Sequence, residues 1–168
     1  EEAEEIQSKL IHGSPAQVTK IEQKEKIEQP PMLFNLTDLQ KESNKRFGFT
    51  AEQTLSIVQK LYENLLLTYP RTDSRYLTVA MAATLPARLN AIRRTELGTV
   101  VSSITDTNIT SKRYVDDRKV TDHTAIVVTN VSPNVSTLTE NETKIYLLVA
   151  RRMVGIFLPP ARIQQTSI

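Results

Sequence analysis

A tyrosine, an arginine and several small polar residues follow one another in the segment Leu67–Tyr76, which reads LTYPRTDSRY. Pro70 has a fixed φ and biases Tyr69 away from helical geometry, so we expect the preceding helix to end by about Thr68. In an extended chain residues two apart share a face, which predicts that the Arg71 guanidinium lies beside the Tyr69 hydroxyl. The segment would then hold a nucleophile and a cation side by side.

The chemistry that this pair favours is attack on a phosphodiester. A free phenol, with a pKa of about 10, is a weak nucleophile at neutral pH, but a neighbouring cation favours the phenolate. Arginine also holds phosphate oxygens through two parallel hydrogen bonds. Thr72, Asp73 and Ser74 are expected to orient Arg71 or to contact a nucleic-acid backbone. The alternative is an ordinary half-buried loop tyrosine, which a bare Tyr-Pro-Arg triplet favours.

The composition limits the classes of protein that this chain can belong to. Its 168 residues are enough for one domain with a core, or for two small pieces. With a net charge of +2, a nucleic-acid site must come from local placement of Lys and Arg. The absence of cysteine excludes a disulfide framework and thiolate metal sites and fits a cytosolic protein. No apolar run reaches membrane-spanning length, and no signal peptide is visible.

Helix signals dominate the elements that must position these residues. We expect helices over residues 1–10, 79–83 and 86–95, and a strand over residues 18–24 that continues as a solvated strand or linker to residue 28. Thr37, Thr50 and Thr139 each open a capping box, and Gly48 is expected to end the helix that starts at Thr37. The pairs Pro30-Pro31 and Pro159-Pro160 mark boundaries.

The apolar pattern predicts which residues form the core. In the helix that follows Thr50, an inward stripe is expected from residues at helical spacing: Leu55, Val58, Leu61, Tyr62 and Leu65. The last helix carries a second stripe: Ile145, Leu148, Val149, Ile156 and Phe157. Residues 125–129 predict a buried strand or an extended approach to the last helix, and residues 102–118 a loop with weak strand character. We interpret Asp116 and Asp117 as solvated loop acids, and His12 as a surface residue.

A family resemblance adds to this interpretation. Thr68–Ser74 resembles the active-site tyrosine motif of the type IA DNA topoisomerases, most closely the bacterial topoisomerase III members. Thr121–Ile126, with the sequence TDHTAI, resembles an Asp-His-x-Ala-Ile motif of the same family. Residues 30–40, 44–50 and 150–160 resemble the entry to the tyrosine domain, its next helix junction and its exit helix. The resemblance covers most of residues 16–168.

The resemblance implies roles for particular residues and a fold class. Tyr69 would be the nucleophile that becomes joined to DNA, Arg71 the cation that orients the phosphate, and His123 a third active-site residue at that phosphate. Without the family, a structural loop histidine is an equal alternative for His123. The implied fold class is α+β, mainly α. Residues 1–31 would belong to an arch and hinge domain, residues 32–160 to a helical tyrosine-bearing domain, and residues 161–168 to a return strand.

The resemblance also implies what this chain lacks. The family joins and breaks DNA with Mg²⁺ held by an acidic Toprim domain, and no Asp-x-Asp sequence occurs here. We therefore expect no metal ligands in this chain, which would be the central part of a longer enzyme and inactive alone. Its expected partners are single-stranded DNA and the remaining domains of that enzyme, in the cytoplasm at the bacterial nucleoid and not at a membrane.

Basic clusters and two competing functions remain open from the sequence. Arg151 and Arg152 are candidate DNA-binding residues, although a solvated helix face explains such clusters more often, and the same holds for Arg88, Arg93 and Arg94. A non-catalytic helical module that binds single strands or proteins, with Tyr69 only stacking, is the alternative function. Within the enzyme class, topoisomerase I and reverse gyrase are alternatives to topoisomerase III.

Overall fold

The computed structural model describes residues 2–11 and 17–167, so the interpretation of His12 as a surface residue lies outside the described part. The chain divides into two units. One comprises Glu1–Glu28 and Pro160–Ile168, and the other Gln29–Pro159. The division falls close to the two proline pairs of the sequence, and the assignment of the first unit to an arch domain stays a prediction.

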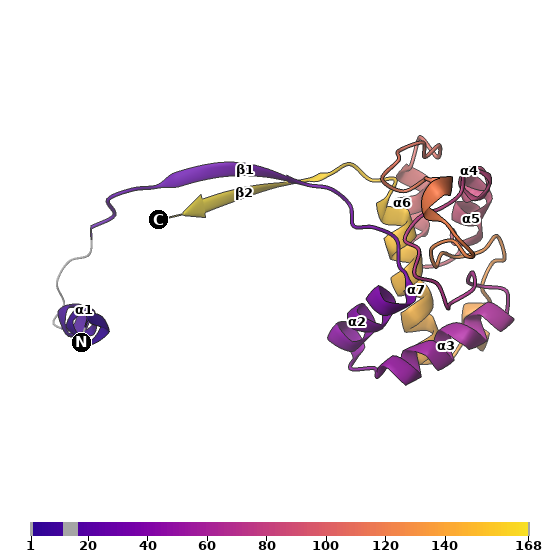
Figure 1. Cartoon of the computed structure of the whole chain (residues 1–168), viewed down its shortest axis with the longest axis horizontal. Helices are drawn as coiled ribbons and strands as arrows, with labels where there is room; N and C mark the ends of the chain where they lie inside the picture. Colours follow the sequence, from indigo (N-terminus) through magenta and orange to yellow (C-terminus); the bar gives the residue numbers. More distant parts are fainter. Residues whose placement is uncertain (1, 12–16, 168) are drawn as a thin grey trace. The chain divides into compact units, whose positions relative to one another are not determined.

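The first unit holds a helix and a two-stranded ribbon. The helix α1 spans Glu2–Ile11, as expected. Strand β1, Glu22–Glu28, pairs antiparallel with β2, Ala161–Ser167, with Glu22 opposite Ser167 and Glu28 opposite Ala161 (Figure 1). The strand expected over residues 18–24 therefore lies further along the chain, because backbone pairing with β2 sets its limits. Neither strand buries a side chain.

The second unit is a bundle of helices joined by extended segments. Its long helices are α2, Leu36–Phe47, α3, Ala51–Glu63, and α7, Glu140–Gly155. Helix α3 packs against both α2 and α7 (Figure 1). The shorter elements are α4 (Val79–Ala82), α5 (Leu85–Ala91), α6 (Gly98–Ser103) and the 3-10 turns η1 (Asp117–Lys119) and η2 (Val135–Thr137). The expected class, α+β and mainly α, is confirmed.

The helix caps follow the sequence at two of the three predicted positions. Thr50 and Thr139 each accept a hydrogen bond from the backbone amide of the third residue of their helix. The side chain of that residue accepts one from the threonine amide, so both capping boxes are confirmed. The box predicted at Thr37 is wrong, because Asn35 is the N-cap and accepts from the Asp38 amide at 2.8 Å. Gly48 ends α2 as expected, with a left-handed φ of 72°.

The core of the second unit lies between α7 and a buried extended segment, residues 125–128. Ile145, Val149 and Met153 of α7 are fully buried. The extended segment makes isolated bridges to Phe34 and Leu67 and is not part of a strand, so of the two expectations the extended approach to the last helix is the one that the structure shows. Arg88 of α5 donates to the Val128 carbonyl at 2.6 Å, so this arginine supports the segment and is not a solvated helix cation.

Helix α5 ends earlier than its sequence predicts, and α6 was not expected. The Thr95 hydroxyl donates to the Ile92 carbonyl at 2.7 Å and accepts from the Leu97 amide at 3.2 Å, a local pattern that competes with a helix. At Gly98 a Cβ would lie 2.2 Å from the Arg93 carbonyl oxygen, so the chain turns back closely there. The turn separates α5 from α6.

The predicted stripe of α3 is wrong at its C-terminal end. Val58 and Leu61 are buried, but Leu65 is 65% exposed and Tyr62 36% exposed. The helix stops at Glu63, and Leu65 then adopts a φ of 59°. A left-handed conformation costs a residue other than glycine about 1–2 kcal/mol. The turn at Leu65 takes its side chain out of the stripe.

Asp116 is buried, contrary to its interpretation as a solvated acid. Its carboxylate accepts from the Arg118 side chain at 3.1 Å and from the Arg118 amide at 3.3 Å, which caps η1. The hydrogen bond from Arg118 lowers the pKa of Asp116 below its ordinary value. Asp117 is exposed but accepts from the Val79 amide at 3.2 Å, so it joins η1 to the start of α4.

Candidate active site around Tyr69

The segment between α3 and α4 is extended, as the proline predicts. The Thr68 amide donates to the Val127 carbonyl at 3.0 Å, and the Thr68 hydroxyl donates to the Ala125 carbonyl at 3.0 Å. Thr68 also accepts from the Val127 amide at 3.0 Å. These bonds fix the backbone immediately before Tyr69 onto the buried segment 125–128.

Tyr69 is in contact with two other rings. Its ring meets Tyr62 edge to face, with centroids 5.4 Å apart and planes at 82°. Its centroid also lies 4.3 Å from that of His123. Tyr69 is half-buried and His123 is exposed. The structure thus brings together the tyrosine and the histidine that the sequence analysis took from motifs far apart in the chain.

One pocket, of about 470 Å³, is lined by the loop before η1 and does not include Tyr69. A second pocket contains Tyr69, the candidate nucleophile. It measures about 380 Å³. Its lining residues come from the turn after α3, from α4 and from the chain around His123: Tyr62, Leu65, Leu67, Thr68, Tyr69, Met81, Asp122, His123, Thr124 and Thr129. A substrate that enters it can reach Tyr69 and His123 together.

Arg71 is held by α3. Its guanidinium donates to the Gln59 side-chain oxygen at 2.8 Å, and Gln59 in turn donates to Glu63 at 3.0 Å. Among the hydrogen bonds of the described residues none joins Arg71 to the Tyr69 hydroxyl, so that contact stays a prediction. Sequence reasoning missed Gln59. Its spacing of four from Glu63, at the end of α3 that leads to Tyr69, was the available signal.

Thr72 connects the tyrosine segment to the histidine segment. Its hydroxyl donates to the His123 carbonyl at 3.1 Å and accepts from the Ser74 amide at 3.1 Å. Thr72 is buried, so this hydroxyl supports the site from within and is not presented to solvent. The Ser74 hydroxyl likewise turns to the protein, donating to the Lys119 carbonyl at 3.2 Å.

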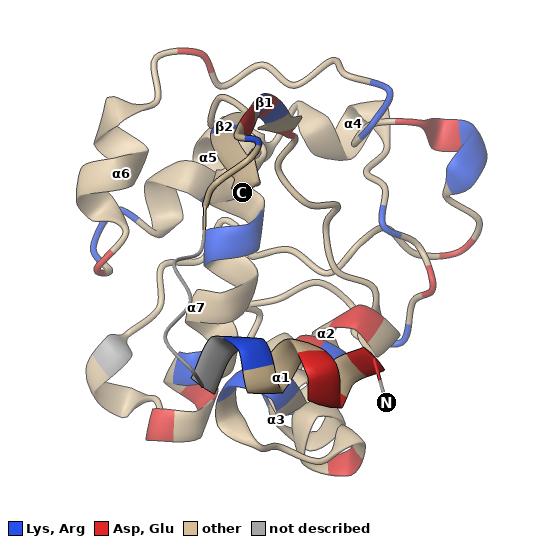
Figure 2. Ribbon diagram, turned by 90° about the vertical axis from the view of Figure 1, so that its left-hand side faces the viewer, with Lys and Arg blue, Asp and Glu red and all other residues tan. Residues whose placement is uncertain are grey.

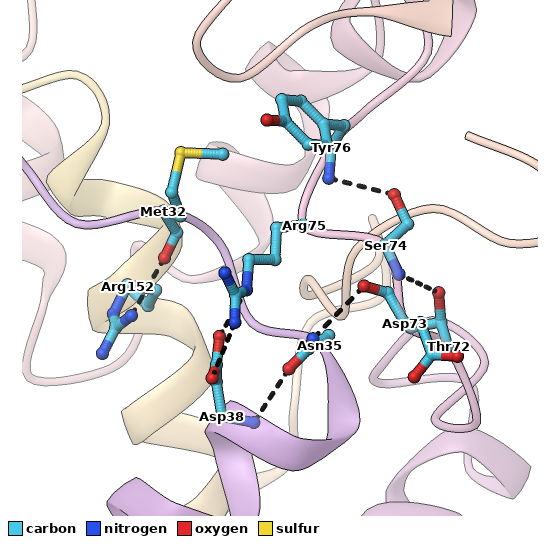
Figure 3. Close-up of polar contacts among 9 residues, drawn as sticks. All are labelled: Met32, Asn35, Asp38, Thr72, Asp73, Ser74, Arg75, Tyr76 and Arg152. Atoms are coloured by element: carbon cyan, nitrogen blue, oxygen red, sulfur yellow. Dashed lines mark hydrogen bonds and ion pairs between the residues drawn. The ribbon is translucent and has the colours of Figure 1, made fainter. Parts of the chain in front are cut away.

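The start of α2 anchors the other side of the segment. Asn35 donates from its side chain to the Asp73 carbonyl at 3.2 Å while capping α2, and Arg75 forms an ion pair with Asp38 at 2.5 Å (Figure 3). The Leu36 amide donates to the Thr72 carbonyl at 3.1 Å. The Asp73 side chain is exposed. A role for Thr72, Asp73 and Ser74 in DNA binding stays a prediction.

Arg151 and Arg152 make their contacts elsewhere. Arg152 donates to the Met32 carbonyl at 2.9 Å (Figure 3). Its guanidinium also lies 3.8 Å from the centroid of the Phe34 ring. Burial lowers the pKa of Arg152. Arg151 pairs with Glu96. In Figure 2 basic residues are spread over several elements, α7 among them, with acidic residues between them. Whether either arginine contacts DNA stays a prediction.

Over the described residues, no group of three or more His, Asp or Glu side chains is placed to hold a metal ion. No helix within residues 2–11 and 17–167 is long and apolar enough to cross a membrane.

Comparison with known proteins places this geometry in a family. A family model described as DNA topoisomerase matches residues 1–168. The chain belongs to the DNA topoisomerase family. The match confirms the resemblance drawn from the motifs at Tyr69 and His123, and with it the assignment to the type IA enzymes.

Relatives of this topoisomerase-family chain are much longer proteins. It is 42% identical over 155 residues to DNA topoisomerase 3 of Bacillus thuringiensis, and 40% identical over 162 residues to DNA topoisomerase 3 of Bacillus subtilis. These alignments cover 91% and 95% of the chain but only 21% and 22% of the relatives. The chain thus spans about a fifth of their length.

A solved structure shares the fold of this topoisomerase-family chain. Full-length topoisomerase I of Thermotoga maritima aligns with a TM-score of 0.60, over 88% of this chain and 24% of that one. The two are 24% identical in sequence, so this likeness speaks for the fold alone.

Proposed function

We propose that this chain is the central, tyrosine-bearing part of a type IA DNA topoisomerase of the topoisomerase III kind. The observation that carries the proposal is the placement of Tyr69 against His123, with ring centroids 4.3 Å apart at the mouth of one pocket. The name shared by the bacillary relatives supports topoisomerase III over topoisomerase I and reverse gyrase. The bacterial relatives also support a place in the cytoplasm, at the nucleoid.

The proposed reaction is a transesterification on one strand of DNA. The Tyr69 oxygen loses its proton and forms a bond to phosphorus, the bond from phosphorus to the 3′ oxygen breaks, and that oxygen takes up a proton. Tyr69 then carries the 5′ phosphate, and attack by the 3′ hydroxyl reverses the step after a strand has passed. The ester conserves the energy of the broken bond, so the reaction needs no ATP.

Each neighbour of Tyr69 has a task in this step. Arg71, steadied by Gln59, would hold a non-bridging phosphate oxygen, and His123 would donate to the phosphate when protonated. Positioning and charge stabilisation account for most of the rate in phosphoryl transfer. Mg²⁺ would be held by the Toprim domain of the intact enzyme. The partners of this chain would be single-stranded DNA and the remaining domains of that enzyme.

The test is to trap the covalent product in the full-length enzyme that contains this chain. The enzyme is mixed with a labelled single-stranded oligonucleotide and Mg²⁺, denatured, and examined for label on the protein. We expect label on the wild type and none on Tyr69→Phe. Tyr76→Phe is the matched control, because its hydroxyl accepts from Lys119 and lies outside the pocket residues. Oligonucleotide binding without label in any protein would favour the non-catalytic binding module.

A further inference from the structure

An apolar surface beside Tyr69 has no role in the reaction above. Leu65 and Tyr62 line the pocket of Tyr69 and are among the exposed large apolar side chains of the described residues. Met81 of α4 lines the same pocket and is half-buried. Tyr62, Leu65 and Met81 thus form an apolar wall of the pocket. Tyr62 and Leu65 of this wall are exposed to solvent, and Met81 also packs against the core.

The backbone holds Leu65 in this exposed position. Its amide donates to the Tyr62 carbonyl at 2.8 Å, and its carbonyl accepts from the Thr129 hydroxyl. The next residue is tied back as well, because the Leu66 amide donates to the Leu61 carbonyl at 2.8 Å. A left-handed φ of 59° is thus fixed at a leucine, and such conformations persist mainly at functional sites.

Other lining residues of the same pocket are polar. They are Asp122, His123 and Thr124, and Tyr69 lines the pocket with them. A nucleotide has the same two-sided chemistry, since its phosphate needs donors and its base offers flat apolar faces. Single-stranded nucleic acids are commonly held by unstacked bases on aromatic side chains, and apolar side chains such as Leu and Met wedge against bases.

We propose that Tyr62, Leu65 and Met81 form a subsite for one nucleobase next to the phosphate that Tyr69 attacks. This inference rests on the proposed function and adds that the scissile strand is held with that base unstacked from its neighbour. The occupant follows from continuity, because the apolar wall and the phosphate-binding histidine belong to one pocket of about 380 Å³. The subsite recognises the flat face that every base has, so it tolerates any sequence.

The experiment measures binding without chemistry. Tyr69→Phe protein is titrated with a short single-stranded oligonucleotide, and then with a set in which one nucleotide at a time is abasic. We expect one position at which the missing base weakens binding about 5-fold to 100-fold, the range that stacking of one base supplies. Other positions should change affinity less, because phosphate contacts remain.

Two variants connect that effect to the pocket. Leu65→Asn keeps a residue that tolerates a left-handed φ and removes the apolar side chain, and Tyr62→Gln keeps a good helix former and removes the ring. In both variants, removing the base at the sensitive position should no longer weaken binding of the oligonucleotide. Val79→Ala is the matched control, since Val79 is exposed on α4 but does not line this pocket. Thermal melting checks that each protein is folded.

The outcomes separate this inference from the proposed function. The subsite proposal would be overturned if no abasic position weakened binding, whether the protein then binds through phosphates alone or does not bind at all. It would also be overturned if the abasic effect were the same in both variants as in the parent protein. Covalent label at Tyr69 would still support the transesterification in that case. A position-specific effect without covalent label would support the base subsite and leave the chain as a single-strand-binding module.

Discussion

At the scale of single residues, the candidate site depends on hydroxyl and amide groups that face inward. Thr72 is buried and satisfies both the His123 carbonyl and the Ser74 amide. Gln59 supports Arg71 in the same way from α3. Catalytic groups need such support, because a side chain without fixed neighbours rarely holds the geometry that a reaction requires. Much of the polar sequence around Tyr69 therefore builds the site.

The structural role of Thr72 leads to a prediction about stability. Thr72→Val keeps the shape but removes the hydroxyl, leaving the His123 carbonyl and the Ser74 amide without this partner. We expect the free energy of unfolding to fall by about 1–3 kcal/mol, measured by urea denaturation. Thr72→Ser restores the hydroxyl and should recover most of the loss. Equal stability of Thr72→Val and wild type would show that the hydroxyl does not stabilise the fold.

At the scale of elements, the extended segment 67–76 is held from both sides. The buried segment 125–128 binds it through Thr68, and the start of α2 binds it through Asn35 and the Leu36 amide. Asn35 has two tasks, since its side-chain oxygen caps α2 and its side-chain nitrogen donates to Asp73. The position of Tyr69 is thereby tied to where α2 begins.

The placement of the cap predicts a contrast between two neighbouring positions. Asn35→Ala removes the N-cap and a long-range hydrogen bond, so it should lower the free energy of unfolding by about 1–2 kcal/mol. Thr37→Ala changes an exposed residue inside the helix and should have an effect within about 0.5 kcal/mol. Urea denaturation of the two proteins side by side measures this. The reverse order would return the cap to Thr37.

At the scale of the whole molecule, the two units differ in what stabilises them. The Gln29–Pro159 unit contains the buried apolar residues, from Leu33 to Ile156. The ribbon of β1 and β2 buries no side chain on either face. An isolated pair of strands is marginally stable in water, so the ribbon adds little to the stability of this chain.

This difference predicts the result of a truncation. Residues 29–159 alone should unfold cooperatively, with a free energy of unfolding within about 1 kcal/mol of that of the whole chain, by urea denaturation followed by circular dichroism. A shorter chain, residues 36–159, lacks the buried Leu33 and Phe34 and should lose several kcal/mol. A loss of cooperative unfolding already in residues 29–159 would show that the other unit supports the fold.

The sequence alone determined whatever depends on near neighbours in the chain. The capping boxes at Thr50 and Thr139, the stop at Gly48 and the extended backbone at Tyr69 follow from a few adjacent residues and were predicted correctly. The family followed from short motifs around Tyr69 and His123. The fold class was implied by the family resemblance, and the local helix signals agreed with it, because helices are built from local hydrogen bonds.

Only the tertiary structure decided the features that join distant parts of the chain. The bond of Asn35 to Asp73, the support of Arg71 by Gln59 and the bond of Thr72 to His123 join residues that sequence spacing does not relate. Leu65 is the clearest case, since its helical spacing predicted burial while the bonds to Tyr62 and Thr129 hold it in solvent. The spacing of apolar residues predicts which side chains share one face of a regular helix. It does not predict the burial of residues beyond the point where the helix ends.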